Sequence, residues 1–141
     1  MPKLILIDTG PLIALFDKDD KYHKNIKDFI KKDRFKFVST TAVVTEVTHM
    51  LDFNINAQIG FLEWIIREGL VLHEIRPKGI IRVIELCKKY QDRPMDFADA
   101  TLVVAAEQTG LREIISIDFD FDVYRIFKKE RIENIFRKQL K

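Results

Sequence analysis

Four acidic residues stand at places where the pattern of hydrophobic residues would not normally put a charge: Asp8, Glu46, Asp99 and Asp118. Two of them end short apolar runs, and the other two interrupt apolar helical patterns. A buried carboxylate is costly unless a cation or dedicated hydrogen-bond donors offset its desolvation. The sequence has few basic residues beside these four. We therefore expect the four side chains to meet in the fold and to bind a divalent metal ion.

Three of these residues also have ordinary structural explanations. Asp8 follows an apolar run and precedes a helical pattern, where aspartate often caps the helix. Asp118 opens the acidic segment 118–122, which is also typical of a turn. Glu46 falls at the edge of the apolar arc of its helix, between Val43 and Met50, where a long side chain could still reach solvent.

Asp99 is the strongest single indication of a site. The predicted helical stretch from Phe97 to Ala106 has only two polar residues, Asp99 and Thr101, so we expect it to be buried on most sides. Asp96 lies three residues before Asp99, on the same face of the helix. Because Asp96 is also placed to cap that helix, capping and a functional role remain open for it.

The residue types at these positions favour phosphate chemistry. Oxygen ligands alone suit Mg²⁺ or Mn²⁺, and there is no Cys/His cluster of zinc spacing. His49 lies one helical turn from Glu46 and is interpreted as a surface residue. There is neither a lysine-bearing phosphate loop nor a glycine-rich dinucleotide fingerprint, which argues against nucleotide hydrolysis of the P-loop kind.

Short apolar runs alternate with longer helical patterns, which predicts an α/β fold with a central, mainly parallel sheet between helices. Strands are predicted at Lys3–Ile7, Lys36–Val38, Leu70–His73, Glu113–Ile117 and near Asn134–Phe136. Helices are predicted from Thr9 as N-cap, then at Lys21–Lys32, Thr40–Leu51, Asn54–Arg67, Pro77–Lys89 and Pro94–Gln108. Because sites of such sheets lie at the carboxyl ends of the strands, Asp8 and Asp118 should emerge at the same edge.

The composition describes an ordinary folded protein. The chain has 141 residues, 47% of them hydrophobic, and a net charge of +2, so we expect one domain over residues 1–141. The segment from Val123 to the end is basic and could contact phosphates or be a solvated terminus. One cysteine, Cys87, interpreted as a packing residue, fits a reducing compartment. No apolar run approaches the roughly 18 residues of a membrane span, so we expect a cytoplasmic protein without a membrane partner.

The order and spacing of four short motifs resemble PIN-domain ribonucleases, and most of all the VapC-like toxins of toxin–antitoxin systems. The motifs are Leu4–Thr9, Thr45–Val47, Phe97–Ala100 and Ser116–Phe121. The resemblance covers essentially the whole chain. It implies a three-layer α/β/α sandwich, cleavage of RNA phosphodiester bonds by a metal-activated water, and Mg²⁺ or Mn²⁺ as cofactor. It also implies a homodimer and a small antitoxin partner.

The same resemblance assigns the site residues. Asp8, Glu46, Asp99 and Asp118 match the family's acidic positions, and Asp96 and Asp120 lie where some members carry further acids, so they rank second. Ser116 stands where the family commonly has threonine, and it keeps the hydroxyl. Arg93 and the basic tail are candidates for holding flanking phosphates.

Segment 55–67 is apolar on more than one side. We interpret Ile55, Ile59, Leu62, Ile65 and Ile66 as its core-facing stripe, with Trp64 roughly opposite. A dimer or antitoxin surface would explain the second apolar side, and so would a deeply buried helix.

Two other functions are compatible with parts of the pattern. A non-catalytic PIN-like protein that binds RNA or acts as a scaffold would keep the fold without needing the acids. A phosphatase or receiver-like domain would use Asp8 as phospho-acceptor. However, Gly10 stands where such phosphatases carry a second aspartate, and Asp8 has no acidic neighbour.

Overall fold

The computed structural model describes residues 1–140, apart from the side chains of residues 139 and 140. Its centre is a five-stranded sheet in which every pair of neighbours is parallel, in the order β3-β2-β1-β4-β7. The strands are β1 (Lys3–Ile7), β2 (Phe35–Ser39), β3 (Leu70–Leu72), β4 (Glu113–Ile115) and β7 (Glu133–Asn134). With β1 in the middle, the carboxyl ends of β1 and β4 are adjacent, as Leu6 pairs with Ile114 and Ile7 with Ile115.

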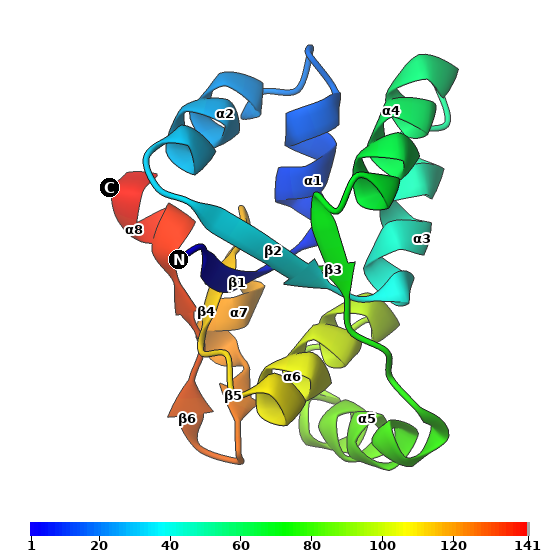
Figure 1. Cartoon of the computed structure of the whole chain (residues 1–141). Coiled ribbons are helices and arrows are strands. Elements are labelled where there is room, and N and C mark those ends of the chain that lie inside the picture. The colour runs from blue at the N-terminus through cyan, green and yellow to red at the C-terminus, as the bar shows by residue number, and fades with distance from the viewer. Residues whose placement is uncertain (141) are drawn as a thin grey trace.

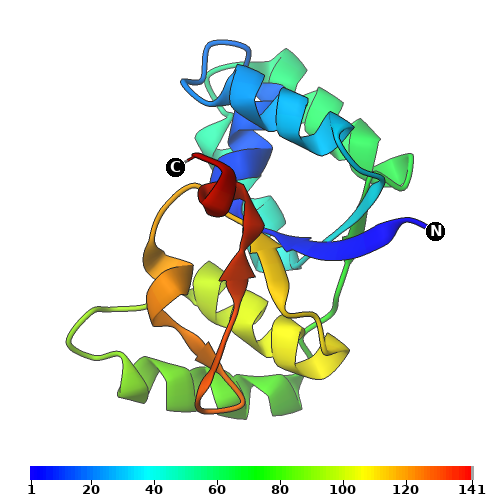
Figure 2. The same cartoon turned by 90° about the vertical axis from the view of Figure 1, so that its left-hand side faces the viewer.

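Helices cover both faces of this sheet, which gives three layers (Figures 1 and 2). On one side lie α1 (Thr9–Phe16), α2 (His23–Lys31) and α4 (Ile55–Ile66), and on the other lie α5 (Pro77–Lys89) and α6 (Phe97–Thr109). Helix α3 (Thr41–Met50) contacts both α1 and α6 and so connects the two layers. The described chain ends with α7 (Asp120–Val123), the hairpin of β5 (Arg125–Ile126) and β6 (Glu130–Arg131), and α8 (Ile135–Leu140).

The core sits between the sheet and its helices. Ile5, Leu6 and Ile7 of β1 are fully buried, as a central strand covered on both faces requires. Helix α6 is buried from Ala98 to Ala106, which confirms the expectation that it is surrounded on most sides. Among the described residues, no helix is both long and apolar enough to cross a membrane.

Several predicted boundaries shift by a few residues because polar contacts end the elements. Helix α6 begins at Phe97 rather than Pro94, since Asp96 caps it through a hydrogen bond from the Asp99 N–H. Strand β4 ends at Ile115 because Ser116 turns to bond with Asn134. The N-cap of α1 is Asp8 by backbone geometry, and Thr9 is the first helical residue.

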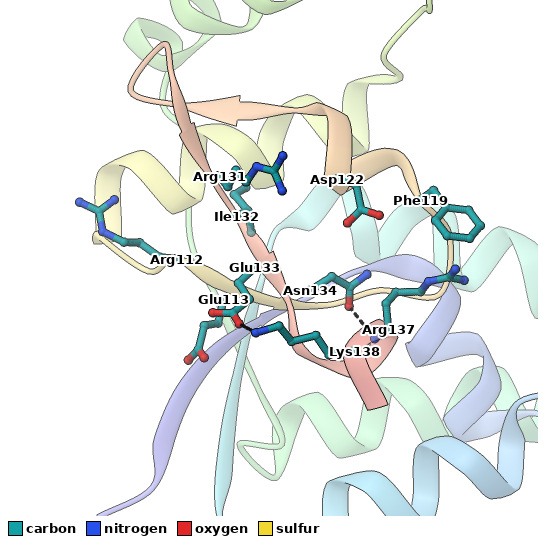
Figure 3. Close-up of a pocket in the computed structure, with 10 residues that line it drawn as sticks. All are labelled: Arg112, Glu113, Phe119, Asp122, Arg131, Ile132, Glu133, Asn134, Arg137 and Lys138. Carbon is teal, nitrogen blue, oxygen red and sulfur yellow. Dashed lines mark hydrogen bonds and ion pairs between the residues drawn. The ribbon is translucent and has the colours of Figure 1, made fainter. Parts of the chain in front are cut away.

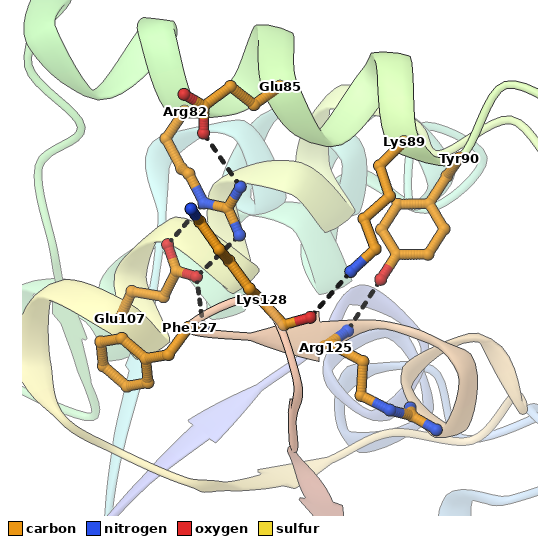
Figure 4. Close-up of polar contacts among 8 residues, drawn as sticks. All are labelled: Arg82, Glu85, Lys89, Tyr90, Glu107, Arg125, Phe127 and Lys128. Atoms are coloured by element: carbon orange, nitrogen blue, oxygen red, sulfur yellow. Dashed lines mark hydrogen bonds and ion pairs between the residues drawn. The ribbon is translucent and has the colours of Figure 1, made fainter.

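The end of the chain was predicted least well. Only β7, at Glu133–Asn134, occupies the region expected for a strand, and the next residues form α8. The β5–β6 hairpin and α7 were not predicted. The hairpin is fastened to the helical layer by Glu107 of α6, which accepts hydrogen bonds from the backbone N–H of Phe127 and from Arg82 of α5 (Figure 4).

The predicted core-facing stripe of α4 is wrong. Phe61 is fully buried, and Trp64 packs against Phe16 and Phe37, so this side of the helix faces the core. The expected stripe is instead largely exposed, with Ile66 at 83%, and its other exposed members are Ile55, Ile59 and Leu62. Cys87, expected to pack, is exposed as well. Aliphatic residues on one face and aromatic residues on the other make both faces apolar in sequence, and the larger aromatic rings occupy the core.

Glycine at position 69 is explained by the same packing. After α4 the chain passes directly beside the indole of Trp64, and a side chain on Gly69 would collide with that ring. The closely packed turn places β3 next to β2.

Candidate functional site

All six acidic residues singled out from the sequence line one pocket of about 210 Å³ at the carboxyl end of the sheet. We call it the acidic pocket, and its carboxylates are Asp8, Glu46, Asp96, Asp99, Asp118 and Asp120. They come from five places in the chain: the end of β1, helix α3, the start of α6, the loop after β4 and the start of α7. The parallel pairing of β1 and β4 brings the end of β1 and the loop after β4 together.

Asp8 is buried, with 4% of its surface exposed. Although it occupies the N-cap position of α1, its side chain makes no capping hydrogen bond. Its Oδ2 instead accepts a hydrogen bond of 2.9 Å from the Ser116 hydroxyl. Burial, and to a lesser extent the negative charges of Asp118 and Glu46, raise the pKa of Asp8 to about 7.

Asp99 lies in the first turn of α6 and is 8% exposed. Its Oδ2 accepts a hydrogen bond of 3.0 Å from the hydroxyl of Tyr124, a buried residue that packs against Tyr90 and Phe121. Burial raises the pKa of Asp99 to about 8, and the charges of Asp8 and Asp96 add to this effect. Asp99 would therefore be mainly protonated at neutral pH without a cation.

Asp118 and Asp120 belong to the loop that leads from β4 into α7. The Oδ1 of Asp118 accepts a hydrogen bond of 3.0 Å from the backbone N–H of Asp120, which fixes the turn. Burial raises the pKa of Asp118 too, and the charge of Asp120 contributes. Asp120 forms an ion pair of 3.0 Å with Arg93, so the arginine proposed to hold phosphate is engaged by an acid of the site.

The remaining two acids enter the acidic pocket from helices. Asp96 does cap α6, as its Oδ1 accepts the Asp99 N–H at 2.7 Å. It also lines the pocket, so its capping role does not remove it from the candidate site. Glu46 of α3 is half-buried beside exposed Met50, at the edge of the buried surface formed by Val43 and Val47.

Charge in this pocket is poorly balanced. Within residues 1–140, no basic side chain forms an ion pair with Asp8, Glu46, Asp99 or Asp118. In the described part of the chain, no three Asp, Glu, His or Cys side chains lie close enough together to bind one metal ion in their present positions. Asp8, Asp99 and Asp118 each accept a hydrogen bond from a neutral donor instead, and none of these donors offsets the repulsion between the negative charges.

The donor chemistry of the acidic pocket nevertheless fits a hard divalent cation. Its polar groups are carboxylate oxygens, the ligands that Mg²⁺ and Mn²⁺ prefer. Thr9, which also lines the pocket, has a buried hydroxyl without a hydrogen-bond partner among the described residues. A buried hydroxyl normally has a partner, and a ligand or its water would supply one here.

Two residues that support the site were not identified from the sequence. Tyr124 orients Asp99 through its hydroxyl, but in the sequence it belongs to the basic segment that begins at Val123, where only the charge indicates a function. Asn134 holds Ser116 from both sides, accepting its N–H at 3.3 Å and donating to its carbonyl at 3.0 Å. Nothing in the sequence pattern connects either residue to an acid, because each contact depends on how the last segment folds back. His49, interpreted as a surface residue, is exposed.

Comparisons with known proteins agree with this architecture. The family model of the PIN domain matches residues 5–126. Ribonuclease VapC26 of Mycobacterium tuberculosis is 26% identical over 116 residues, which are 81% of this chain and 86% of that protein.

Solved structures extend the comparison to the fold. VapC20 of Mycobacterium tuberculosis, described as a toxin that cleaves the sarcin-ricin loop, superposes with a TM-score of 0.76 at 18% identity, over 84% of this chain and 92% of that one. A chain of a toxin–antitoxin complex from Klebsiella pneumoniae superposes with a TM-score of 0.63, also at 18% identity, over 82% of this chain and 88% of that one. At such low identity the similarity shows a common fold.

Proposed function

The chain belongs to the PIN domain family, and we propose that it is a metal-dependent endoribonuclease, the toxin of a toxin–antitoxin pair. The observation that carries this proposal is the acidic pocket, where six carboxylates gather and the two most buried ones, Asp8 and Asp99, have pKa values raised to about 7 and 8. The relative named ribonuclease supports the choice of RNA as substrate, and the structural neighbour described as cleaving the sarcin-ricin loop is consistent with it.

In this proposal Asp8, Asp99 and Asp118 are metal ligands, Glu46 binds the metal directly or through a water, and Asp96 and Asp120 are of second rank. A bound Mg²⁺ or Mn²⁺ would lower the pKa of a water molecule and polarise the phosphoryl oxygen of the scissile bond. The chain itself presents carboxylates in fixed orientations. Ser116 restrains Asp8, Tyr124 restrains Asp99, and the Asp120 N–H restrains Asp118.

The test is cleavage of end-labelled RNAs, with tRNA and structured loops included, in Mn²⁺, Mg²⁺ or EDTA. The matched variant is Asp8→Asn, which keeps the shape of the side chain and removes its charge. We expect discrete cuts that require metal and disappear in the variant. Equal cutting by both proteins would point to contamination or a misplaced site. No cutting by antitoxin-free protein would favour a non-catalytic RNA-binding or scaffold protein.

The proposed protein partners are a second copy of this chain and a small antitoxin. Two helices carry apolar side chains into solvent: α4 through Ile55, Ile59 and Ile66, and α5 through Ile81 and Ile84. Exposed apolar surface on two helices is typical of protein contacts, and the Klebsiella pneumoniae neighbour is a chain of a toxin–antitoxin complex. A nuclease of this kind would act in the cytoplasm.

Light scattering tests the partner proposal. We expect the purified protein to be a dimer at micromolar concentration. Substituting Ile59→Glu or Ile84→Glu should weaken either the dimer or the antitoxin complex, and each variant identifies the face that it disrupts. A monomer that is unchanged by both substitutions and binds no antitoxin would contradict the proposal.

A further inference from the structure

A second and larger pocket, of about 710 Å³, lies next to the acidic pocket on the side of β7 and α8 (Figure 3). We call it the arginine pocket, and the residues that matter here are Phe119, Asp122, Arg131 and Arg137. The two pockets meet at one loop, because Asp118 and Asp120 line the acidic pocket and Phe119 between them lines the arginine pocket. Its volume is in the range of pockets that bind small ligands, which spans roughly 300–1,000 Å³.

Phe119 is an aromatic side chain held in an exposed position. It is 57% exposed, although neighbouring Phe121 is fully buried. The guanidinium carbon of Arg137 lies 3.4 Å from the centre of the Phe119 ring, and an Arg137 N–H donates a hydrogen bond of 2.8 Å to the Ile117 carbonyl. One face of the ring is thus covered by a fixed cation, and the exposure that remains belongs to the rest of the ring. Proteins that bind single-stranded nucleic acid stack bases on such rings.

The charges of the arginine pocket suit a phosphate backbone. Two of its three carboxylates are already engaged by lysines, Glu113 by Lys3 at 3.0 Å and Glu133 by Lys138. Within residues 1–140, Arg131 and Arg137 form no ion pair, so Arg131 and the N–H groups of Arg137 that do not bond to Ile117 are available to phosphate oxygens. The third carboxylate, Asp122, faces the pocket as a hydrogen-bond acceptor. A ribose 2′-hydroxyl is a donor for such a group, and DNA lacks it.

We propose that the arginine pocket binds the single-stranded RNA nucleotide next to the scissile phosphate. Its base would stack on Phe119, its phosphate would contact Arg137 and Arg131, and its 2′-hydroxyl would reach Asp122. The place beside the scissile phosphate rests on the proposed function, because it assumes that the acidic pocket cuts RNA. The bound nucleotide would lie close to the scissile phosphate, because Asp118 and Asp120, the chain neighbours of Phe119, line the acidic pocket.

Fluorescence anisotropy of short, labelled single-stranded RNA in EDTA tests the pocket without cleavage. Phe119→Leu should weaken RNA binding roughly tenfold, the loss expected from one stacked base. Arg137→Gln should weaken binding too, and should lower the slope of log Kd against log salt by about 0.7, the value for one phosphate contact on a single strand. Phe119→Leu should leave that slope unchanged.

Two matched variants control for general damage. Phe127 is also an exposed phenylalanine covered by an arginine, with the Arg112 guanidinium 5.2 Å from its ring centre, but it does not line the arginine pocket. Arg67 is an exposed arginine at the end of α4. Phe127→Leu and Arg67→Gln should bind RNA like the wild type. A series of RNAs would each carry one abasic nucleotide at a different position. The wild type should bind one of these RNAs more weakly than the intact RNA, and Phe119→Leu should bind that RNA and the intact RNA equally well.

The outcomes separate this inference from the proposed function. If the wild type cuts RNA with metal but Phe119→Leu and Arg137→Gln bind RNA like the wild type, the arginine pocket is not an RNA subsite and the nuclease stands. A wild type that binds no RNA also overturns the subsite. If both variants lose RNA affinity but the wild type cuts no RNA with any metal, the proposed function fails, and the pocket's place beside a scissile phosphate fails with it.

Discussion

Helix α6 carries two carboxylates about two turns apart that the fold treats in opposite ways. Glu107 accepts hydrogen bonds of 2.9 and 3.0 Å from Arg82 and of 2.7 Å from the Phe127 N–H (Figure 4). Asp99 is more deeply buried, yet it receives only the Tyr124 hydroxyl, and its charged neighbours are the acids Asp8 and Asp96. Arg82 forms an ion pair with Glu107, at the end of α6 away from the acidic pocket. Among the described residues, no basic side chain forms an ion pair with Asp99. Stability accounts for Glu107, whereas for Asp99 we propose binding of an external cation.

The largest expected effect separates these two residues by activity. Asp99→Asn should reduce RNA cleavage by more than the roughly 10–100-fold lost when only a ligand's supporting partner is removed, because it removes a ligand itself. Glu107→Gln should retain cleavage at a temperature where it is folded. Initial rates at saturating Mn²⁺ check this, and wild-type turnover in Asp99→Asn would remove Asp99 from the site.

The second effect is a dependence of metal-free stability on pH. Folding raises the pKa values of Asp8 and Asp99 from 3.8 to about 7 and 8, so the folded state binds more protons than the unfolded state between pH 4 and 8. The free energy of unfolding must then fall as the pH rises through this window, by an amount on the order of a few kcal/mol. Urea unfolding in EDTA measures it.

A divalent cation should reverse that loss. It binds the ionised carboxylates of the folded state, so a concentration of 100 times Kd adds about 2.7 kcal/mol at pH 8. The same addition should have little effect at pH 5, where protons compete for the ligands. Equal stabilisation at both pH values would mean that the cation binds elsewhere.

The third effect concerns the balanced end of α6. Glu107→Gln should lower the free energy of unfolding by about 1–3 kcal/mol, because it leaves the half-buried guanidinium of Arg82 without its main partner. Glu85→Gln is the matched control, since Glu85 pairs with the same arginine from an exposed position and should change stability by about 0.5 kcal/mol or less. Equal effects of both variants would show that burial of this pair does not matter.

The smallest effect tests the hydrogen bond to Asp99. Tyr124→Phe removes the donor and keeps the ring that packs on Tyr90 and Phe121, so cleavage should fall about tenfold with little change in stability. Tyr90→Phe removes a neighbouring hydroxyl that accepts from the Arg125 N–H and does not contact Asp99. If both variants cleave RNA equally well, Tyr124 has no part in orienting the site.

The acidic pocket could be predicted from the sequence because four of its acids end or interrupt regular apolar patterns. Asp99 is the clearest example, as it lies inside nine buried residues of α6. The parallel sheet was predictable for a related reason, since short apolar runs alternate with helices, and parallel strands bring Asp8 and Asp118 to one edge. These inferences need only periodicity and the rules of sheet topology.

Other parts depend on contacts that periodicity does not encode. In α4 both faces are apolar, and the choice of Phe61 and Trp64 for the core follows from the rings of Phe16 and Phe37 that they meet. Tyr124 reaches Asp99 only because the chain after β4 turns back through α7. The arginine pocket likewise forms where α8 returns beside the loop of Phe119, so a basic tail in sequence becomes one wall of a pocket in the fold.

Calorimetric titration of metal-free protein with Mn²⁺ at pH 8 tests the central claim most directly. The uncompensated carboxylates predict saturable binding of one or two ions, with protons released on binding, and loss of that binding in the double variant of Asp8→Asn and Asp99→Asn. Glu107→Gln should bind like the wild type. Absence of saturable binding, or binding that survives the double variant, would show that the acidic pocket does not hold the metal.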